Sequence, residues 1–391
     1  MTRKLALFLV IALLALPVTG VRAHVISKSH STWEFSGDHA RVEFRIPAVE
    51  LDNLPADESP VDYWPSHLRL FRGDEECRAT PALKTSTGAD GWIIYRWDVA
   101  CPPEGGSAIR SDLLRGLVPQ HVHLARVRDE TGGFREKVVV GSDPTWELEE
   151  STGHGTSLGG YFLLGVEHIL GGWDHLAFVL ALVLLVGSFP EVLKLVTGFT
   201  VAHSLTLGLA ALGLLRPDTA AVEILIGFSI ALVAAENCWL LGGRGWGAPV
   251  AVIGALVVAG LWALGGSGWL APLTWFGLAL FTFCHFRLLG ITNWGQFLRA
   301  MIAFSFGLIH GFGFGGALME IGLPPGRIVP ALLGFNVGVE VGQLMVVALV
   351  FPVLKLISRR SERRGRLVAE ICSAGVFAVG IYWIVTRNWG I

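Results

Sequence analysis

The segment from Glu167 to His175 carries four ionisable side chains inside a long apolar run, from about residue 157 to 187. They are Glu167, His168, Asp174 and His175. Placing such groups in hydrocarbon is costly, so in membrane helices they face the interior of a bundle or mark an ion path. The alternative is that they satisfy one another by hydrogen bonds in a packed bundle. Imidazole and carboxylate without thiolate suit divalent ions such as Ni²⁺, Co²⁺ or Zn²⁺ rather than Cu⁺.

The spacing of the two histidines limits how they bind an ion. His168 and His175 are seven residues apart, which puts them on one face of a straight helix but about 10.5 Å apart along its axis. They cannot share one ion at that distance, because metal–nitrogen bonds are about 2 Å long. Two arrangements remain open. Either Gly171 and Gly172 break the helix and bring its flanks together, or the histidines belong to successive sites along one path.

Two further histidines are related by an internal repeat. His203 and His310 each follow a phenylalanine by four residues, and 310 − 203 gives an offset of 107. The same offset aligns Pro217 with Pro324 and Gly227-Phe228 with Gly334-Phe335. Duplicated membrane scaffolds are common in transporters, with the site at the repeat interface near mid-membrane. We therefore expect His203 and His310 to be ligands, and the glycines around His310 to let a neighbouring backbone approach closely or the helix open.

A polar stripe occurs in a later apolar run. Asn336, Glu340 and Gln343 lie at i, i+4 and i+7, on one helix face. We expect Glu340 to be a mid-membrane ligand; the alternative is a protonated acid making one interhelical hydrogen bond. Glu236 would be an exit group, and His285 a packing residue. The predicted metal ligands are His168, Asp174, His175, His203, His310, Glu340 and Asn336, with the metal ion as substrate and no organic cofactor.

The composition indicates a membrane protein. Of 391 residues, 52% are hydrophobic and 16% charged, whereas soluble domains have about 25% charged residues. Nucleic-acid binding has no support, because no basic patch with interleaved aromatic residues occurs. Eight apolar runs are long enough to cross a bilayer, and the arginine-rich segment 358–366 should be cytoplasmic. The runs are 158–187, 192–214, 219–241, 247–265, 269–289, 297–321, 328–357 and 367–386.

The N-terminal part has a different organisation. Residues 1–23 resemble a signal peptide, cleaved after Ala23. Residues 24–148 alternate with period two in short runs, which predicts an exported all-β, sandwich-like domain of about seven antiparallel strands. Residues 149–157 are a linker, and 158–391 form the helical membrane domain with its internal parallel repeat. In the exported segment we expect a Cys77–Cys101 disulfide. His121, His123 and the mature terminus His24 could capture metal, or could be surface histidines.

These motifs resemble the HupE/UreJ family of bacterial membrane proteins, in particular its longer branch with an exported N-terminal domain. The family's His-Pro-x-x-Gly-x-Asp-His signature is matched by His168, Gly172, Asp174 and His175, with Ile169 in place of the proline. Segments 199–204, 306–314 and 335–340 resemble further family segments. The resemblance implies a nickel permease of the bacterial inner membrane.

We therefore expect a non-enzymatic permease for a divalent metal ion, nickel or cobalt, with its N-terminal domain in the periplasm. Its partners would be the metal ion and the lipid bilayer, and a periplasmic protein partner of the β-domain is left open. One alternative is an intramembrane zinc enzyme, with Glu340 or Asp174 as general base. Another is a non-transporting assembly partner that docks through the β-domain.

Overall fold

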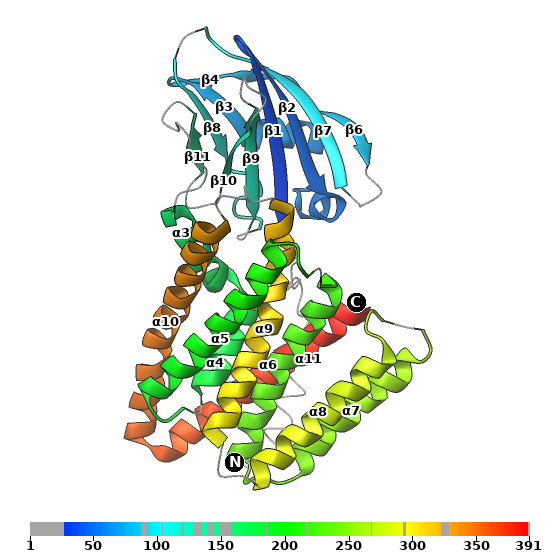
Figure 1. Ribbon diagram of the computed structural model, residues 1–391, viewed down its shortest axis with the longest axis vertical. Coiled ribbons are helices and arrows are strands. Elements are labelled where there is room, and N and C mark those ends of the chain that lie inside the picture. Colours follow the sequence, from blue (N-terminus) through cyan, green and yellow to red (C-terminus); the bar gives the residue numbers. More distant parts are fainter. Residues whose placement is uncertain are drawn as a thin grey trace. The chain divides into compact units, whose positions relative to one another are not determined.

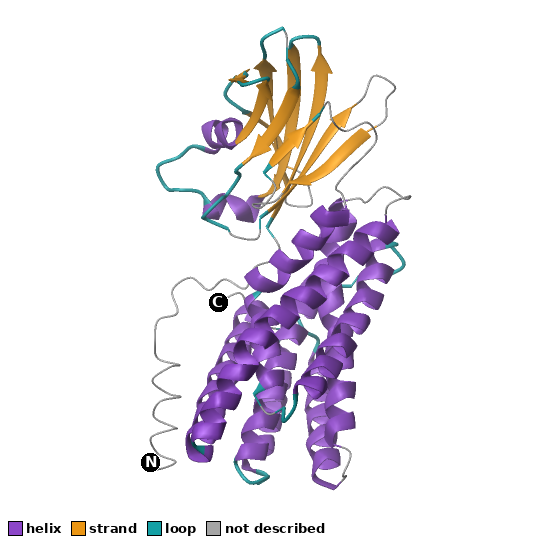
Figure 2. Cartoon of the chain, turned by 90° about the vertical axis from the view of Figure 1, so that its left-hand side faces the viewer, coloured by secondary structure: helices purple, strands orange, loops and turns teal. Residues whose placement is uncertain are grey.

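The computed structural model describes residues 27–389 apart from short gaps. The gaps are 88–91, 104, 119–120, 129–133, 140–143, 149–157, 185, 216, 267, 292–294 and 322–327. The predicted signal peptide, its cleavage site, His24 and the predicted linker lie outside the described residues. The described chain forms two compact units. One contains the strands, α3 and the first turns of α10, and the other contains α4 to α9, the rest of α10 and α11. Figure 2 shows the strands in orange and the long helices in purple.

The strands of the first unit form two sheets. The larger has the order β10-β9-β1-β2-β7-β5, with β6 also on β7, and the smaller has the order β11-β8-β3-β4. The larger comprises β1 (Lys28–Ser36), β2 (His39–Pro47), β5 (Arg78–Ala79), β6 (Leu83–Thr87), β7 (Trp92–Ala100), β9 (Val122–Arg128) and β10 (Phe134–Val139). The smaller comprises β3 (Leu68–Arg72), β4 (Glu75–Glu76), β8 (Ser107–Ser111) and β11 (Thr145–Glu147). Two short helices, η1 (Ala48–Asn53) and α2 (Pro60–His67), connect strands.

Alternating burial explains the core of this unit. Every second residue of β2 is buried, as the period of a strand requires when one face is covered. Phe44 and Trp33 are completely buried, and Phe44 packs against Trp64 of α2 with ring centroids 5.1 Å apart. One pairing departs from the predicted antiparallel pattern: β1 and β9 are parallel, with Ser29 opposite His123.

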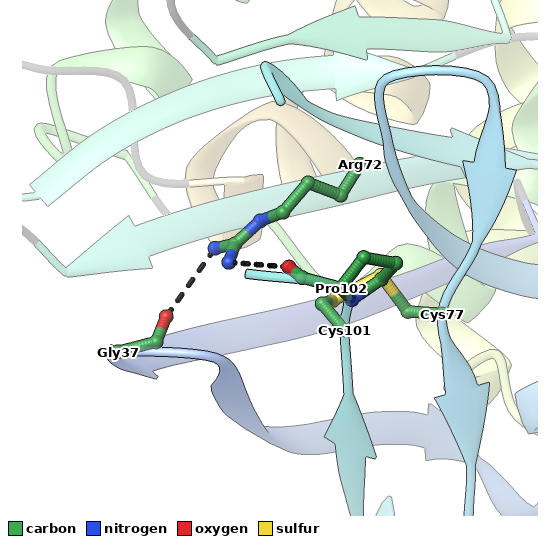
Figure 3. Close-up of a disulfide and its surroundings, with 5 residues drawn as sticks. All are labelled: Gly37, Arg72, Cys77, Cys101 and Pro102. Carbon is green, nitrogen blue, oxygen red and sulfur yellow. Dashed lines mark hydrogen bonds between the residues drawn. A yellow bond between two sulfur atoms is a disulfide. The ribbon is translucent and has the colours of Figure 1, made fainter. Parts of the chain in front are cut away.

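The predicted disulfide between Cys77 and Cys101 is confirmed, with Cα atoms 4.4 Å apart. It ties the short β4–β5 segment to the end of β7. Beside it, Arg72 donates hydrogen bonds to the carbonyl oxygens of Pro102 at 3.0 Å and Gly37 at 3.3 Å (Figure 3). A cross-link that closes a loop of 24 residues is worth about 3 kcal/mol in chain entropy.

The eight apolar runs form nine helices among the described residues, because the first run is divided into α3 and α4, and this confirms the predicted fold class. They are α3 (Leu158–Gly171), α4 (Trp173–Val183), α5 (Phe189–Ala211), α6 (Thr219–Leu241), α7 (Gly247–Ala263), α8 (Pro272–Ile291), α9 (Gly295–Ile321), α10 (Ile328–Arg360) and α11 (Glu362–Trp389). The count of spans differs from eight. Among described residues, six helices are long and apolar enough to cross a membrane, or seven if the broken pair α3–α4 is one span. At 17 residues, α7 is shorter.

Glycines set the helix packing of the second unit. Helix α5 lies against α9, α6 against α11 and α7 against α8 (Figure 1). A Cβ atom added at Gly307 would overlap the Phe199 carbonyl oxygen, and one at Gly311 the His203 carbonyl oxygen. This confirms the close backbone approach expected for the glycines near His310, and α9 stays helical through them. Helices α5 and α9, which the sequence predicts to be related by a repeat, are thereby in direct contact.

Candidate metal centre

The helix breaks between the two histidines of the first apolar run. Gly172 has extended dihedrals, φ −80° and ψ 95°, and separates α3 from α4. Of the two arrangements open from the spacing, the structure therefore has the interrupted helix. His168 lies near the end of α3, in the first unit, where its ring centroid is 5.4 Å from that of Phe335. His175 lies in the first turn of α4, in the second unit.

A carboxylate fixes the orientation of His175. Asp174 Oδ1 accepts hydrogen bonds from the backbone N of His175 at 2.9 Å and from its Nδ1 at 3.0 Å. Because a carboxylate that is ionised only accepts, Nδ1 carries a proton, and in the neutral ring Nε2 presents a lone pair. Carboxylate–imidazole pairs of this kind orient ligating histidines in metal sites.

His203 and His310 are held in the same way. His203 is fully buried on α5, and its Nδ1 lies 3.3 Å from Asn336 Oδ1. His310 is 1% exposed on α9, and its Nδ1 donates to the Phe306 carbonyl oxygen at 2.9 Å. Since a carbonyl only accepts, Nδ1 of His310 carries a proton, and in the neutral ring Nε2 is unprotonated. That Nε2 is buried and has no hydrogen-bond partner among the described residues.

The ring of His175 lies close to both other rings. The ring centroid of His175 is 5.3 Å from that of His310 and 6.4 Å from that of His203. With a metal–nitrogen bond of about 2.1 Å, an ion lies about 3.2 Å from a ligating ring's centroid, so two ligating rings have centroids about 4.5 to 6.4 Å apart. Both observed distances fall in this range. Phe178 and Phe199 pack around His310, with centroids 5.2 and 5.0 Å away, and exclude other polar groups from that side.

Arg387 is a member of this site that the sequence analysis missed. Its guanidinium lies 3.5 Å from Asp174 Oδ2, is 7% exposed, and donates to the Glu223 carbonyl oxygen at 2.6 Å. Asp174 is therefore charge-balanced by Arg387. The one available signal was a lone arginine near the end of the last apolar run, 213 residues after Asp174 in the chain, counted as 387 − 174.

The predicted ligand Glu340 lies away from the histidines. It accepts a hydrogen bond from Thr197 Oγ1 at 2.6 Å, while Gln343 accepts one from Thr200 Oγ1 at 2.9 Å. Thr197 precedes His203 by six residues, about 9 Å along α5. The α10 stripe therefore runs along α5, with Asn336 beside His203 and Glu340 further along.

A second buried polar cluster contains Glu236. Its carboxylate accepts hydrogen bonds from His285 Nε2 and Arg299 Nε, both at 2.9 Å. His285 is therefore a hydrogen-bond partner of Glu236 and not a simple packing residue. The exit role of Glu236 stays a prediction. The structure adds that Arg299 already balances its charge.

The expectations for His121 and His123 are both wrong. These side chains are 8% and 1% exposed, so they are not surface histidines. Their four ring nitrogens all make hydrogen bonds of 2.6 to 2.8 Å to Ser27, Ser29 and Ser31. Burial lowers the pKa of His121 to about 3 and that of His123 well below its usual value. The pair is a neutral hydrogen-bonded ladder and not a metal capture site.

Comparison with known protein families identifies the helical part of the chain. The model of the family described as HupE / UreJ protein matches residues 145–279 and 277–387, more than half of the chain. The chain belongs to the HupE/UreJ family. This is a membrane family with nickel/cobalt permease-like members, associated with transport rather than catalysis. As a HupE/UreJ member the chain is a membrane protein, and its strands before residue 145 lie outside the matched region. A comparison with curated proteins found no match.

Proposed function

We propose that this HupE/UreJ protein is a permease for a divalent transition-metal ion, with nickel as the first candidate and cobalt the second. It would lie in the bacterial inner membrane with the β-domain in the periplasm. The observation that supports this most is common to His175, His203 and His310. Each buried ring has Nδ1 beside an acceptor, so Nε2 is the ring atom that would bind an ion.

We further propose His168 as an additional imidazole ligand. It precedes the break at Gly172 by four residues, and His175 follows that break by three. A broken helix can turn both flanking side chains toward one ion, as discontinuous helices do in other transporters. Asp174 would act by holding His175 rather than by binding the ion, because Oδ1 already accepts from His175 and Oδ2 forms an ion pair with Arg387.

The charge balance suits transport. Since Arg387 neutralises Asp174, the dication would be held by neutral imidazoles. A site must bind strongly enough for the ion to enter and weakly enough for it to leave. Glu340, one of whose oxygens is buried without a hydrogen-bond partner among described residues, would be the next station along α5 and α10.

The test is Ni²⁺ and Co²⁺ uptake into proteoliposomes. His175→Ala and His310→Ala should each reduce flux by tenfold or more, because a lost imidazole removes a ligand bond worth at least about 1.4 kcal/mol. His39→Ala is the matched control, since His39 is an exposed residue of β2. All variants must elute and melt as the wild type does. Flux equal to wild type in both His175→Ala and His310→Ala would refute the proposal. Wild-type protein that retains one zinc and moves no ion would favour the enzyme alternative.

A further inference from the structure

An elongated apolar cavity lies among α6, α7, α8 and α11, and none of the described histidines lines it. Its volume is about 540 Å³, which falls within the roughly 300–1,000 Å³ of ligand pockets. One wall is formed by α7, which contributes Ala248, Ala251 and Ala255. The opposite wall includes Phe228 and Ala231 of α6. The small side chains of α7 leave the space between these walls open. Figure 1 shows α7 and α8 side by side as a hairpin.

The lining determines what can fill this space. Its surface is almost wholly apolar, and Cys238 provides the one thiol in it. Water needs two to four polar partners to occupy a cavity, and this lining does not offer them. Protein interiors also contain few voids larger than a water molecule. In a membrane protein the available apolar filler is the acyl chain of a lipid.

The dimensions match one extended chain. Lining residues of α7 run from Ala248 to Trp262, a rise of about 21 Å along the helix. The 540 Å³ is the space open to the centre of a water-sized sphere, and dividing it by this length gives a cross-section of about 26 Å², about 6 Å wide. Adding the sphere's radius of about 1.4 Å on each side gives a channel about 9 Å wide. An α-helix is about 10–12 Å across with its side chains, so a helix of another chain does not fit.

The two ends of the cavity differ. Near Ala248 and Cys238 lies the C-terminal end of α6, where Arg366 donates a hydrogen bond to the Leu241 carbonyl oxygen. Arg244 lies over Trp239 at the same end, 5.9 Å from the ring centroid. At the other end Trp275 and Trp389 stack, with ring centroids 6.0 Å apart. Cations at one end and stacked rings at the other fit an acyl chain that enters from the arginine end.

We propose that this cavity binds one acyl chain of a membrane phospholipid, with the lipid phosphate beside Arg244 and Arg366. Glu370 also pairs with Arg366, at 3.0 Å, so Arg366 would be shared between the carboxylate and the phosphate. The site is independent of the metal centre, and its failure would leave the proposed transport function untouched.

Alkylation of Cys238 tests this on the full-length wild-type protein. Delipidated protein in detergent is treated with an apolar thiol reagent, and labelling is measured for each cysteine-containing peptide by mass spectrometry. Adding phosphatidylglycerol should slow labelling of Cys238 about tenfold at a lipid concentration about ten times its Kd, since about nine-tenths of the sites are then occupied. Cys284 is exposed and does not line the cavity, so its rate is the internal control. Unchanged Cys238 labelling would overturn the proposal.

A filled cavity provides the second test. Ala255→Phe places a ring in the channel and should lower the phospholipid retained per purified chain about tenfold, while Val250→Phe, on an exposed position of α7 outside the lining, should not. Arg244→Gln with Arg366→Gln should weaken protection by anionic lipid and leave protection by a free fatty alcohol intact. Equal phospholipid retention in Ala255→Phe and wild type would refute the acyl-chain assignment. Protection by anionic lipid that is as strong in the arginine variant as in wild type would refute the phosphate assignment.

Discussion

Acidification is expected to loosen the pairing of β1 with β9, because two neutral histidines are buried between these strands. The Trp33 indole donates to Ser31 Oγ at 2.8 Å. An indole only donates, so Ser31 is free to give its own proton to His123 Nε2, 2.8 Å away. Nδ1 of His123 then donates to Ser29, and Ser29 in turn donates to His121 Nε2. A proton added to either ring would replace an acceptor by a second donor.

The magnitude follows from the pKa of His121, which burial lowers from 6.5 to about 3. Between these values the unfolded chain binds a proton that the folded chain does not, so the free energy of unfolding rises with pH. The stabilisation that comes from keeping His121 neutral is fully present above about pH 6.5 and is lost as the pH falls toward 3. At pH 5, about 1.5 pH units below the pKa of the unfolded chain, the free energy of unfolding is lower by about 2 kcal/mol. His30, with its pKa lowered to about 4 chiefly by burial, adds a loss of the same sign. Glu50, whose pKa is raised by burial, acts in the opposite direction.

Hydrogen exchange on the full-length protein in nanodiscs measures this effect. After correction for intrinsic exchange rates, protection of the β1 and β9 peptides should fall about 30-fold or more from pH 7.5 to pH 5, the equivalent of about 2 kcal/mol. His121→Gln keeps a donor and an acceptor without a titrating group, so its pH dependence should shrink by about that amount. Peptides of α6 serve as the reference. The reasoning is refuted if protection does not change with pH, or if His121→Gln has the same pH dependence as wild type.

Two further predictions concern the helices. Gly307→Ala should lower the free energy of unfolding by about 1–3 kcal/mol in thermal denaturation, because the added methyl group overlaps the Phe199 carbonyl. Gly198→Ala is the control, because a Cβ atom there would meet open space. Equal melting temperatures of the two variants would contradict the packing argument. Arg387→Gln should cost about 1–3 kcal/mol, because the half-buried Asp174 carboxylate loses its counter-charge and keeps only its hydrogen bonds to His175. Asp174→Asn in the same chain should recover part of that loss, and strictly additive losses would show that the two side chains do not interact.

Local pattern was sufficient for much of the architecture. The apolar runs became helices because their length and hydropathy are properties of contiguous residues. The period-two segments became strands for the same reason, and β2 and β7 show the expected alternation. Cys77 and Cys101 could be paired because they are the two cysteines of the sequence that precede the apolar runs. Gly171 and Gly172 marked a place where a helix breaks cheaply, since glycine has a low helix propensity.

Contacts between distant residues were not accessible in this way. The pairing of Asp174 with Arg387 depends on how α4 and α11 pack, and neither residue's neighbours in the chain contain that information. His121 and His123 were interpreted as metal-capturing or surface residues, because alternation does not say which side of a strand is covered. The parallel pairing of β1 with β9 buried them against serines instead. Residue types and spacing thus determined which groups could bind a metal ion. Tertiary packing decided which of them meet, because side chains far apart in sequence are brought together only by the burial of the helices and sheets that carry them.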